Sequence, residues 1–304
     1  MVEYQTILEE IHESLKNVEN TGEVASYIPE LANVSKDKFG IHLQLITGEN
    51  FAVGDASEKF SIQSISKVLS LVKAFQLIGN DLWERVDVEP SGNPFNHLSL
   101  LELENGIPRN PLINSGAIVI ADVLLSHLKN PKEDFLNFVR ELTHDESIHY
   151  NEKIAESERV TGFNNYAAAN LLKAYGNLNN KVEDVLDFYF HQCSIMMDCR
   201  QLTNAFFVFA NKGKCIKEVQ HLTPSQVKRI NAIMLTCGFY DEAGEFAFEV
   251  GLPGKSGVGG GIVALLPHCY TIATWAPALN PKGNSYLGMQ ALEQFTTKTK
   301  LSIF

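Results

Sequence analysis

The stretch FSIQSISKVLSLVKAFQLIG, residues 60–79, is the segment on which the interpretation of the whole chain depends. Apolar residues recur in it at helical spacing and leave little surface for water, which predicts a buried helix. We expect Ser61 to cap its N-terminus, because a serine hydroxyl can accept a hydrogen bond from a free backbone amide. Ser64 and Lys67 stand three residues apart, so a helix places both side chains on one face.

The lysine in this helix indicates unusual chemistry. An unpaired ammonium is costly to bury, so Lys67 must be paired, hydrated or neutral. A neutral Lys67 would be a base beside Ser64, whose place at the helix N-terminus favours developing negative charge. A polar edge on a core helix is the alternative. The tetrapeptide Ser-x-x-Lys is not specific by itself, since it also begins at Ser35, Ser70, Ser126 and Ser225.

The composition is that of a globular chain of 304 residues, 45% apolar and 20% charged. A net charge of −11, with no lysine- or arginine-rich run, argues against a nucleic-acid or anionic membrane surface. No apolar run reaches the roughly 18 residues that a membrane helix needs, and the acidic N-terminus does not resemble a signal peptide. The five cysteines fit no metal-finger spacing, so we expect reduced thiols in a cytoplasmic protein.

The predicted secondary structure changes along the chain. An amphipathic helix is expected over 4–17, and alternating apolar residues around a turn at 48–50 predict a β-hairpin. Residues 80–200 show helical patterns and no strand character. Strands return from residue 244 in EFAFEVG, KSGVGGGIVALLP and HCYTIATWAP, before a last helix at about 284–298. Further helices are expected near 98–105, 115–128, 132–143, 165–175, 182–193, 199–211 and 225–236.

This order of elements indicates a mixed α/β (α+β) fold. We expect an antiparallel sheet built from both parts of the chain and flanked by helices, with an inserted all-helical lobe. The predicted domains are a discontinuous sheet domain, 1–65 and 200–304, and a helical domain, 66–199. The cleft between two such lobes is the usual place for a site.

A glycine-rich segment after Lys255 is the second unusual feature. Lys255, Ser256 and Gly257 are followed by Val258 and three glycines, and glycines at a strand start allow another backbone or a substrate to come close. If this edge faces Ser64, Lys255 supplies positive charge, and the amides of Val258 and Ser64 can form an oxyanion hole. Each such donor is worth about 10²–10³ in rate. The alternative is a tight bend in an edge strand.

Other kinds of site find little support in the residues. The segment from Gly259 to Ala264 matches a dinucleotide fingerprint in text only, because a strand rather than a helix follows it. The nine histidines show no metal-ligand spacing, so we expect neither a metal nor a cofactor. No Gly-x-Ser-x-Gly elbow supports a Ser-His-Asp hydrolase. The polar residues at 157–159 and 164–165 are expected in a link between helices, where such residues are usually caps and surface turns.

Seven longer segments, in order from about Tyr27 to Ser285, are SYIPELA, FSIQSISK, GIPRNPLINSGAI, ESERVTGFNN, LDFYFHQCS, TCGFYDEAGEFAFEVGLPGKSGVGGGI and APALNPKGNS. In these segments and in their order the sequence resembles the glutaminase family. A Ser-x-x-Lys helix start with Lys-Ser-Gly on a later strand is similar to the serine β-lactamase and penicillin-binding fold. The resemblance implies a β-lactamase-like fold and hydrolysis of L-glutamine to L-glutamate and ammonia through an acyl-serine. Ser115 and Gly254 depart from the family pattern, because alanine is expected at both positions.

The resemblance also implies roles for individual residues. Ser64 would be the nucleophile, with Lys67 as its partner base and Tyr240 as a second proton-transfer group; which of the two takes the first proton is open. The amides of Ser64 and Val258 would form the oxyanion hole, with Lys255 in support. The residues implied to hold the amino-acid end of glutamine, or to lie next to the nucleophile, are Asn114, Glu158, Asn165, Tyr189, Tyr27 and Gln63.

Three functions follow as hypotheses. The first is a cytoplasmic glutaminase that takes the small molecule L-glutamine, has no nucleic-acid or membrane partner and, by resemblance, forms a homo-oligomer (dimer or tetramer). It requires the pKa of Lys67 to fall by about three units from its usual value of about 10.4. The second is a penicillin-recognising serine hydrolase, which a β-lactam would acylate. The third is a catalytically silent amino-acid-binding protein, which would bind glutamine without releasing ammonia.

Overall fold

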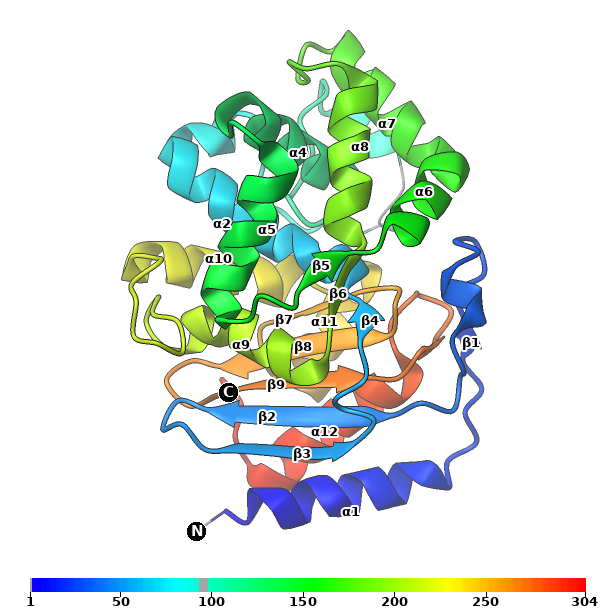
Figure 1. Cartoon of the computed structure of the whole chain (residues 1–304), viewed down its shortest axis with the longest axis vertical. Coiled ribbons are helices and arrows are strands. Elements are labelled where there is room, and N and C mark those ends of the chain that lie inside the picture. The colour runs from blue at the N-terminus through cyan, green and yellow to red at the C-terminus, as the bar shows by residue number, and fades with distance from the viewer. Residues whose placement is uncertain (1, 93–97) are drawn as a thin grey trace.

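A five-stranded antiparallel sheet forms the centre of the computed structural model, which describes residues 2–92 and 98–304. Its strand order is β3-β2-β9-β8-β7, so strands from both parts of the chain lie side by side, as predicted (Figure 1). The predicted hairpin is confirmed. The strands are β2 (Gly40–Leu45), β3 (Asn50–Gly54), β7 (Gly254–Ser256), β8 (Gly261–Leu266) and β9 (Tyr270–Trp275).

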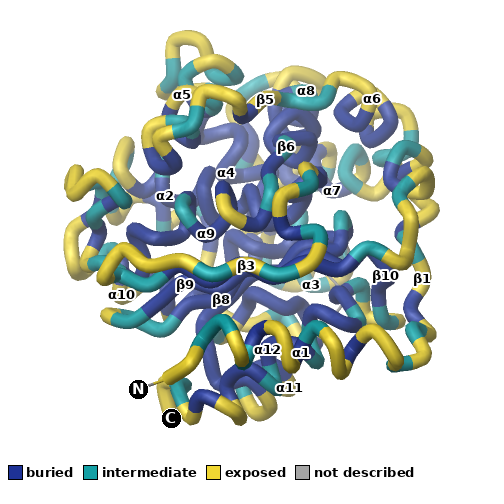
Figure 2. The backbone as a smooth tube through the Cα atoms, turned by 60° about the horizontal axis from the view of Figure 1, so that its bottom comes forward, coloured by how far each residue is buried: buried dark blue, intermediate teal, exposed yellow. Residues whose placement is uncertain are grey.

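The register of the sheet sorts side chains onto two covered faces. Leu43 of β2 lies opposite Ile272 of β9, and both belong to the core beneath the sheet. The next residue of β9, Ala273, belongs to the core on the other face. Successive strand residues point to opposite faces, so the inner strands are buried on both. Figure 2 shows β8 and β9 in dark blue, whereas the edge strand β3 alternates between exposed and intermediate residues.

Helices cover both faces of the sheet. On one face α1 (Tyr4–Lys16) and α12 (Tyr286–Thr299) pack against each other and close a core that includes Leu8, Ile11 and Phe295. On the other face α9 (Cys199–Ala210) lies across β2, β8 and β9. Its Thr203 hydroxyl lies 2.8 Å from Nδ1 of His42, so this buried nitrogen on β2 has a polar partner. The sheet is the middle layer of this half of the molecule (Figure 1).

The helical part is arranged around α4 (Asn114–His127), in which every residue from 115 to 124 is buried. It packs against α2, α7 and α8. A helix that is apolar all round needs such a cover. The surrounding helices are α2 (Ser66–Ile78), α3 (Ser99–Leu103), α5 (Pro131–Thr143), α6 (Glu152–Thr161), α7 (Phe163–Ala174), α8 (Val182–Cys193) and α10 (Pro224–Cys237).

Short elements complete the chain. The two-residue strands β1 (Glu23–Val24) and β10 (Ala278–Leu279) pair with each other beside the main sheet. The remaining elements are the 3₁₀ turns η1 (Leu31–Asn33), η2 (Gln63–Ile65), η3 (Gly79–Glu84) and η4 (Tyr240–Glu242).

Two predicted strand assignments were wrong. The segment EFAFEVG forms α11 (Ala243–Glu249) rather than a strand. A strand would place Phe246 and Phe248 on one face, whereas Phe246 is buried and Phe248 is 86% exposed, as on two sides of a helix. Residues 80–200 also contain strands, because β5 (His149–Tyr150) and β6 (Ile195–Met197) pair with β4 (Phe60–Ser61) in a small sheet of their own.

Across the described residues, no helix combines the length and apolar character needed to cross a membrane. The division into a sheet domain, 1–65 with 200–304, and a helical domain, 66–199, stays a prediction.

Candidate active site

Ser64 lies in a tight turn rather than within a capped helix. The turn η2 precedes α2, which begins only at Ser66. The predicted cap at Ser61 was wrong, since Ser61 belongs to β4 and its hydroxyl donates a hydrogen bond to the Cys193 carbonyl. Gln63, directly before Ser64, has φ = +50°. Such a conformation costs a non-glycine residue on the order of 1–3 kcal/mol and is typical of functional sites.

The Val258 turn packs directly against this segment. A Cβ atom at Gly257 would lie 2.4 Å from the carbonyl oxygen of Ile62, and one at Gly259 would lie 2.2 Å from that of Ser61. Only glycine therefore permits this approach. The prediction that the glycines after Lys255 allow another backbone to come close is thus confirmed, and the turn carrying the Val258 amide lies against the segment that leads into Ser64.

Lys67 is fully buried in the first turn of α2, the helix that packs against α4. Its Nζ donates hydrogen bonds to Oδ1 of Asn114 at 2.6 Å and to the Leu112 carbonyl at 3.3 Å. Within the described part of the chain these contacts, rather than one to Ser64, are the hydrogen bonds of its ammonium group. Burial lowers the pKa of Lys67 to about 8, against the opposing effects of Cys193 and Glu158.

The phenol of Tyr240 lies beside the Ser64 side chain. Tyr240 has φ = +57° in η4 and is buried. Burial raises the pKa of its phenol above the ordinary range, and a hydrogen bond with the Ser64 side chain opposes the shift. The phenol is therefore neutral around neutral pH, and it can both donate and accept a hydrogen bond.

Lys255 lies beneath the ring of Tyr240. Its Nζ is 4.0 Å from the ring centroid, and that of Lys67 is 5.9 Å away. The Lys255 ammonium group is fully buried and donates to the carbonyls of Gly238 at 2.9 Å and Ser256 at 2.7 Å. Burial, followed by the charge of Lys67, lowers the pKa of Lys255 well below its ordinary value. Two amines with weakened basicity thus flank one phenol.

Asn114, Glu158, Asn165 and Tyr189 come together beside this centre from four helices, α4, α6, α7 and α8. Nδ2 of Asn114 donates to Oδ1 of Asn165 at 2.9 Å. Burial raises the pKa of Tyr189 well above its ordinary value, and the neighbouring acids, among them Cys193 and Glu158, add to this shift. The four side chains therefore share one environment with the serine and the lysines.

Glu158 is the most unusual group in this set. Burial raises the pKa of its carboxyl to about 8, although a hydrogen bond from Gln63 and the charge of Lys67 oppose the shift. Its Oε1 is buried and has no hydrogen-bond partner among the described residues. A buried carboxyl oxygen without a hydrogen-bond partner is costly. A cationic group of a ligand would lower the pKa of this carboxyl and would find a ready partner here.

A cavity of about 540 Å³ opens onto these residues. Its lining joins polar side chains of the helical part to the loop before η1, where Tyr27 is 54% exposed and Ile28 is buried. A space of this size accepts an amino acid with water. The lining residues are Tyr27, Ile28, Asn114, Glu158, Thr161, Gly162, Phe163, Asn164 and Asn165.

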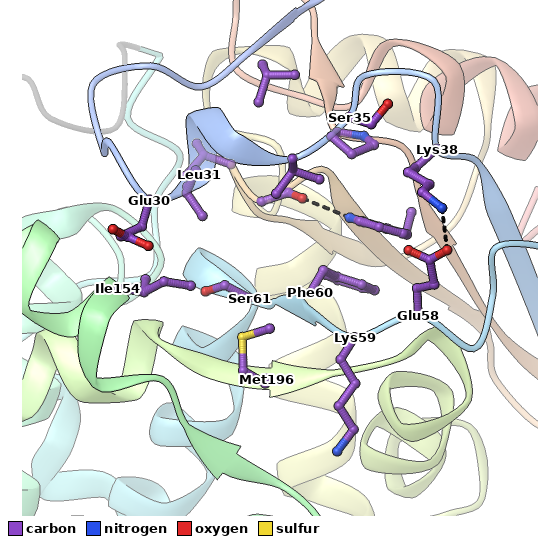
Figure 3. A pocket seen from close by; sticks show the side chains of 16 residues that line it. Glu30, Leu31, Ser35, Lys38, Glu58, Lys59, Phe60, Ser61, Ile154 and Met196 are labelled. Atoms are coloured by element: carbon purple, nitrogen blue, oxygen red, sulfur yellow. Dashed lines mark hydrogen bonds and ion pairs between the residues drawn. The ribbon is translucent and has the colours of Figure 1, made fainter.

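A second cavity, of about 300 Å³, lies behind the Val258 turn (Figure 3). Trp275 lines it and donates from Nε1 to the Gly259 carbonyl at 3.0 Å, while Phe60 stacks on Trp275 at 5.1 Å between ring centroids. At its rim Lys38 pairs with Glu58. The aromatic pair supports the back of the turn that carries the Val258 amide.

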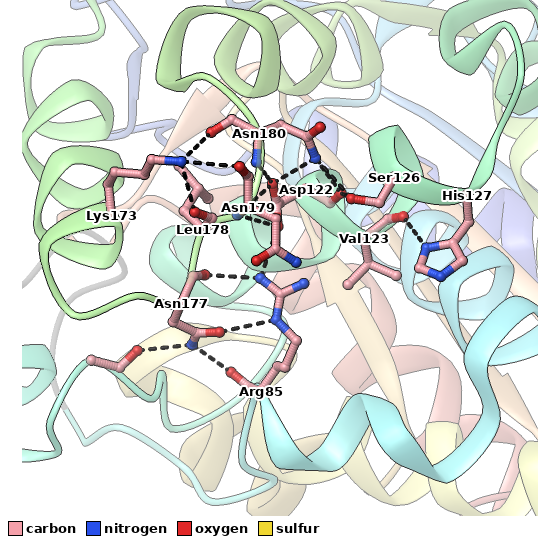
Figure 4. A network of polar contacts seen from close by, with 11 residues as sticks. Arg85, Asp122, Val123, Ser126, His127, Lys173, Asn177, Leu178, Asn179 and Asn180 are labelled. Atoms are coloured by element: carbon pink, nitrogen blue, oxygen red, sulfur yellow. Dashed lines mark hydrogen bonds and ion pairs between the residues drawn. The ribbon is translucent and has the colours of Figure 1, made fainter.

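A polar network holds α4 against the segment between α7 and α8 (Figure 4). Asp122 is fully buried and accepts hydrogen bonds from the backbone amides of Asn179 and Asn180 and from Nη2 of Arg85 at 2.8 Å. The network fixes the relative position of the helices that carry Asn114 and Tyr189.

Sequence reasoning missed two features of the site. Cys193 was expected to be an ordinary core thiol, but it lies among Lys67, Tyr189 and Glu158. It raises the pKa of Lys67 and of Tyr189, and Glu158 raises the pKa of the Cys193 thiol; no spacing pointed to it. The helix α6 was also missed, so Glu158 is helical and not in a link. Its start carries a signal, because the side chain of Asn151 caps it by accepting from two backbone amides.

The sheet, the helical part and the buried serine–lysine centre define a β-lactamase-like protein, which confirms the predicted fold class. The family model described as Glutaminase matches residues 22–304. Curated proteins named Glutaminase from Christiangramia forsetii and Saccharophagus degradans are 57% and 56% identical over 304 residues, covering 100% of this chain and 100% and 99% of their own. The chain belongs to the glutaminase family.

Solved structures agree with this assignment. A probable glutaminase, ybaS, superimposes with a TM-score of 0.94 at 31% identity and covers 99% of this chain and 97% of its own. A probable glutaminase from Bacillus subtilis, complexed with 6-diazo-5-oxo-L-norleucine, gives a TM-score of 0.86 at 31% identity and covers 99% and 95%.

Proposed function

We propose that this chain is an enzyme that hydrolyses L-glutamine to L-glutamate and ammonia through an acyl-serine at Ser64. The family assignment supports the substrate and the reaction. The observation that carries the mechanism is the convergence of Ser64, Lys67, Tyr240 and Lys255 in a buried centre where both lysines have lowered pKa values.

In the acylation step, the Ser64 oxygen attacks the carboxamide carbon of glutamine while its proton passes to a base. Lys67 is suited to this role, since a pKa of about 8 leaves a useful neutral fraction near neutral pH. The phenol of Tyr240, which lies close enough to the Ser64 side chain for that side chain to affect its pKa, relays a proton to the leaving nitrogen. The carbon–nitrogen bond then breaks and ammonia departs. Water attacks the acyl-serine, glutamate leaves, and the proton returns to the Ser64 oxygen.

The negative charge that develops on the carboxamide oxygen needs donors held in place. The Val258 turn is fixed against the Ser64 segment by the contacts of Gly257 and Gly259. The backbone amides of Ser64 and Val258 are the donors we assign to the oxyanion hole, each worth about 10²–10³ in rate. Lys255 supports this region from below the ring of Tyr240.

The amino-acid end of glutamine is assigned to the cavity of about 540 Å³. The unpaired Oε1 of Glu158 suits the α-ammonium group. Asn114, Asn165 and Tyr189 supply hydrogen-bonding groups for the remaining polar atoms, with Tyr27 and Gln63 beside them. Plain amides should be poor substrates, because these buried polar groups would then lack partners.

The assembly and location of the protein are proposed on family membership. We infer a homo-oligomer, a dimer or tetramer, in the cytoplasm. Light scattering coupled to size exclusion would test the assembly, and a monomer at micromolar concentration would contradict it.

Ammonia release from L-glutamine by the purified protein tests the proposed function, with the Ser64→Ala variant beside it. We expect the variant to lose about 10⁴-fold or more in kcat. Ser70→Ala is the matched control, because Ser70 begins another Ser-x-x-Lys sequence six residues later, and its hydroxyl donates to the Lys67 carbonyl within α2.

Each alternative function has its own outcome. Glutamine binding without ammonia release would favour the silent binding protein. Acylation of Ser64 by a β-lactam, with no action on glutamine, would favour the penicillin-recognising hydrolase. Equal loss in the Ser64 and Ser70 variants would contradict the assignment of the nucleophile.

A further inference from the structure

Tyr240 is held in a backbone conformation that it would not adopt by itself. Its φ of +57° belongs to the left-handed region, which a non-glycine residue keeps only when its surroundings determine it. Before it in the chain, a Cβ at Gly238 would lie 1.9 Å from the Gly254 carbonyl, and Phe239 stacks on Phe246. These contacts hold the start of the turn η4.

Glu242 holds the other end of η4. Its side chain is buried, at 6% exposure, and each of its two carboxylate oxygens lies 3.0 Å from Nδ2 of Asn280. One of them also accepts from Nδ2 of Asn284, which is fully buried. A carboxylate only accepts hydrogen bonds, so both amide groups must turn their nitrogens toward it.

The partners of Glu242 belong to a rigid turn. Oδ1 of Asn280 accepts hydrogen bonds from the backbone amides of Lys282 at 3.0 Å and Asn284 at 3.1 Å. The backbone amide of Asn280 donates to the Asn284 carbonyl at 2.8 Å. The hydroxyl of Ser285 then donates to the Ala276 carbonyl next to β9. The turn between β10 and α12 therefore provides a fixed anchor for η4.

We propose that Glu242 is a positioning residue that keeps the phenol of Tyr240 at the reaction centre. It touches neither Ser64 nor the cavity assigned to glutamine, and it acts by fixing the turn on which Tyr240 stands. The inference rests on the proposed function, in which that phenol moves a proton. Displacing a reacting group by about 1 Å can cost about 100-fold in rate, so a loosened η4 should slow catalysis without weakening substrate binding.

A double-mutant cycle tests this proposal. Wild type, Glu242→Ala, Tyr240→Phe and the double variant are compared for kcat and KM with L-glutamine, after circular dichroism has shown that each is folded. We expect Glu242→Ala to lower kcat by about 10- to 100-fold with little change in KM. In the Tyr240→Phe background the same substitution should lower kcat hardly at all, because the group that it positions is gone. Glu242→Gln, which keeps the side-chain volume, serves for the same cycle if the alanine variant does not fold.

The control is Glu245→Gln, which breaks the exposed ion pair with Lys282 at 3.3 Å in the same region and should leave kcat unchanged. An equal fold-loss from Glu242→Ala in both backgrounds would overturn the inference and leave the proposed function intact. Undiminished activity of Tyr240→Phe would instead contradict the proton-transfer role of Tyr240, and the inference would fall with it.

Discussion

Nζ of Lys67 donates a hydrogen bond to Oδ1 of Asn114 at 2.6 Å, and Nδ2 of the same asparagine donates to Asn165 at 2.9 Å. One amide group thus joins the proposed base to the side chains proposed to hold the substrate. Because the amide is neutral, it orients Lys67 without stabilising the ammonium as a carboxylate would. The low pKa of Lys67 therefore depends on which atoms occupy position 114.

The substitution Asn114→Asp should move the pH dependence of the enzyme. In the wild type we expect kcat to rise with pH through about 8, as Lys67 loses its proton. A carboxylate at 114 would favour the charged lysine and raise its pKa, so the rise should shift to higher pH. Asn164→Asp adds the same charge at an exposed neighbour in the cavity lining and should not shift it. A pH profile of kcat checks this, and an unchanged midpoint in Asn114→Asp would rule out Lys67 as the titrating base.

Substitution of Gly257 by alanine should damage catalysis through packing alone. The new Cβ would lie 2.4 Å from the Ile62 carbonyl, so the Val258 turn must move away from Ser64. Loss of one oxyanion donor predicts a fall in kcat of about 10²–10³. Gly244→Ala is the control, since nothing lies within 4 Å of its added methyl and it stands in α11. There the change should neither destabilise the fold nor affect kcat; comparable losses in both variants would contradict the assignment of the Val258 amide.

The sequence revealed those parts of the fold that have a clear period. The hairpin of β2 and β3, strands β8 and β9 and the long helices show alternating or helical apolar patterns. The segment of α11 does not, because Phe246 and Phe248 alternate like a strand and only burial tells which of them faces the core. Strands of two residues, such as β4 and β5, are too short to show any period.

The residues of the candidate site also differ in how far the sequence alone pointed to them. Ser64 and Lys67 were proposed from local spacing, and Lys255 from the glycines that follow it. Glu158 and Tyr240 were joined to them only by family resemblance, since contacts between segments so far apart leave no local signal. Burial also decides the chemistry: a sequence names an acid or an amine, but the low pKa of Lys67 and the high pKa of Glu158 arise from the water that the fold removes.

The substitution Glu158→Gln should affect substrate binding. The charge of a bound α-ammonium group lowers the pKa of Glu158 and favours its carboxylate in the complex. Loss of this partner predicts an increase in KM of about 10- to 100-fold, as expected for a charged hydrogen bond of about 1.5–3 kcal/mol. Steady-state kinetics with L-glutamine measure this, and an unchanged KM would contradict the assigned role.

The same variant should change the stability of the protein with pH. The folded state binds the Glu158 proton up to about pH 8 and the unfolded state only to about 4.5. The stabilisation from this proton is therefore complete below pH 4.5 and is lost as the pH rises to about 8. Urea unfolding across this range should show that Glu158→Gln lacks this decline. Curves for variant and wild type that stay parallel between pH 4.5 and 8 would show that Glu158 titrates normally.

Removal of Asp122 should destabilise the helical part of the fold. Burial disfavours the charge of this carboxylate, but the amides of Asn179 and Asn180 and the guanidinium of Arg85 outweigh that effect and hold its pKa below the ordinary value. Asp122→Ala leaves these donors without their acceptor, which predicts a loss of about 3 kcal/mol in the free energy of unfolding. The loss should not be larger, because Arg85 is 21% exposed and can be hydrated in part. The ionised form carries the stabilisation, so wild-type stability should fall in acid as Asp122 protonates, and the variant should lack that component.

Glu13→Gln is the control for Asp122→Ala, because the pair of Glu13 with Lys16 is exposed and should contribute less than about 1 kcal/mol. Chemical denaturation of both variants at neutral pH measures the difference. If Asp122→Ala lost no more stability than Glu13→Gln, the network around Asp122 could not be what fixes α4, and the position of Asn114 next to Lys67 would have to depend on the apolar packing of α4 against α2 and α8.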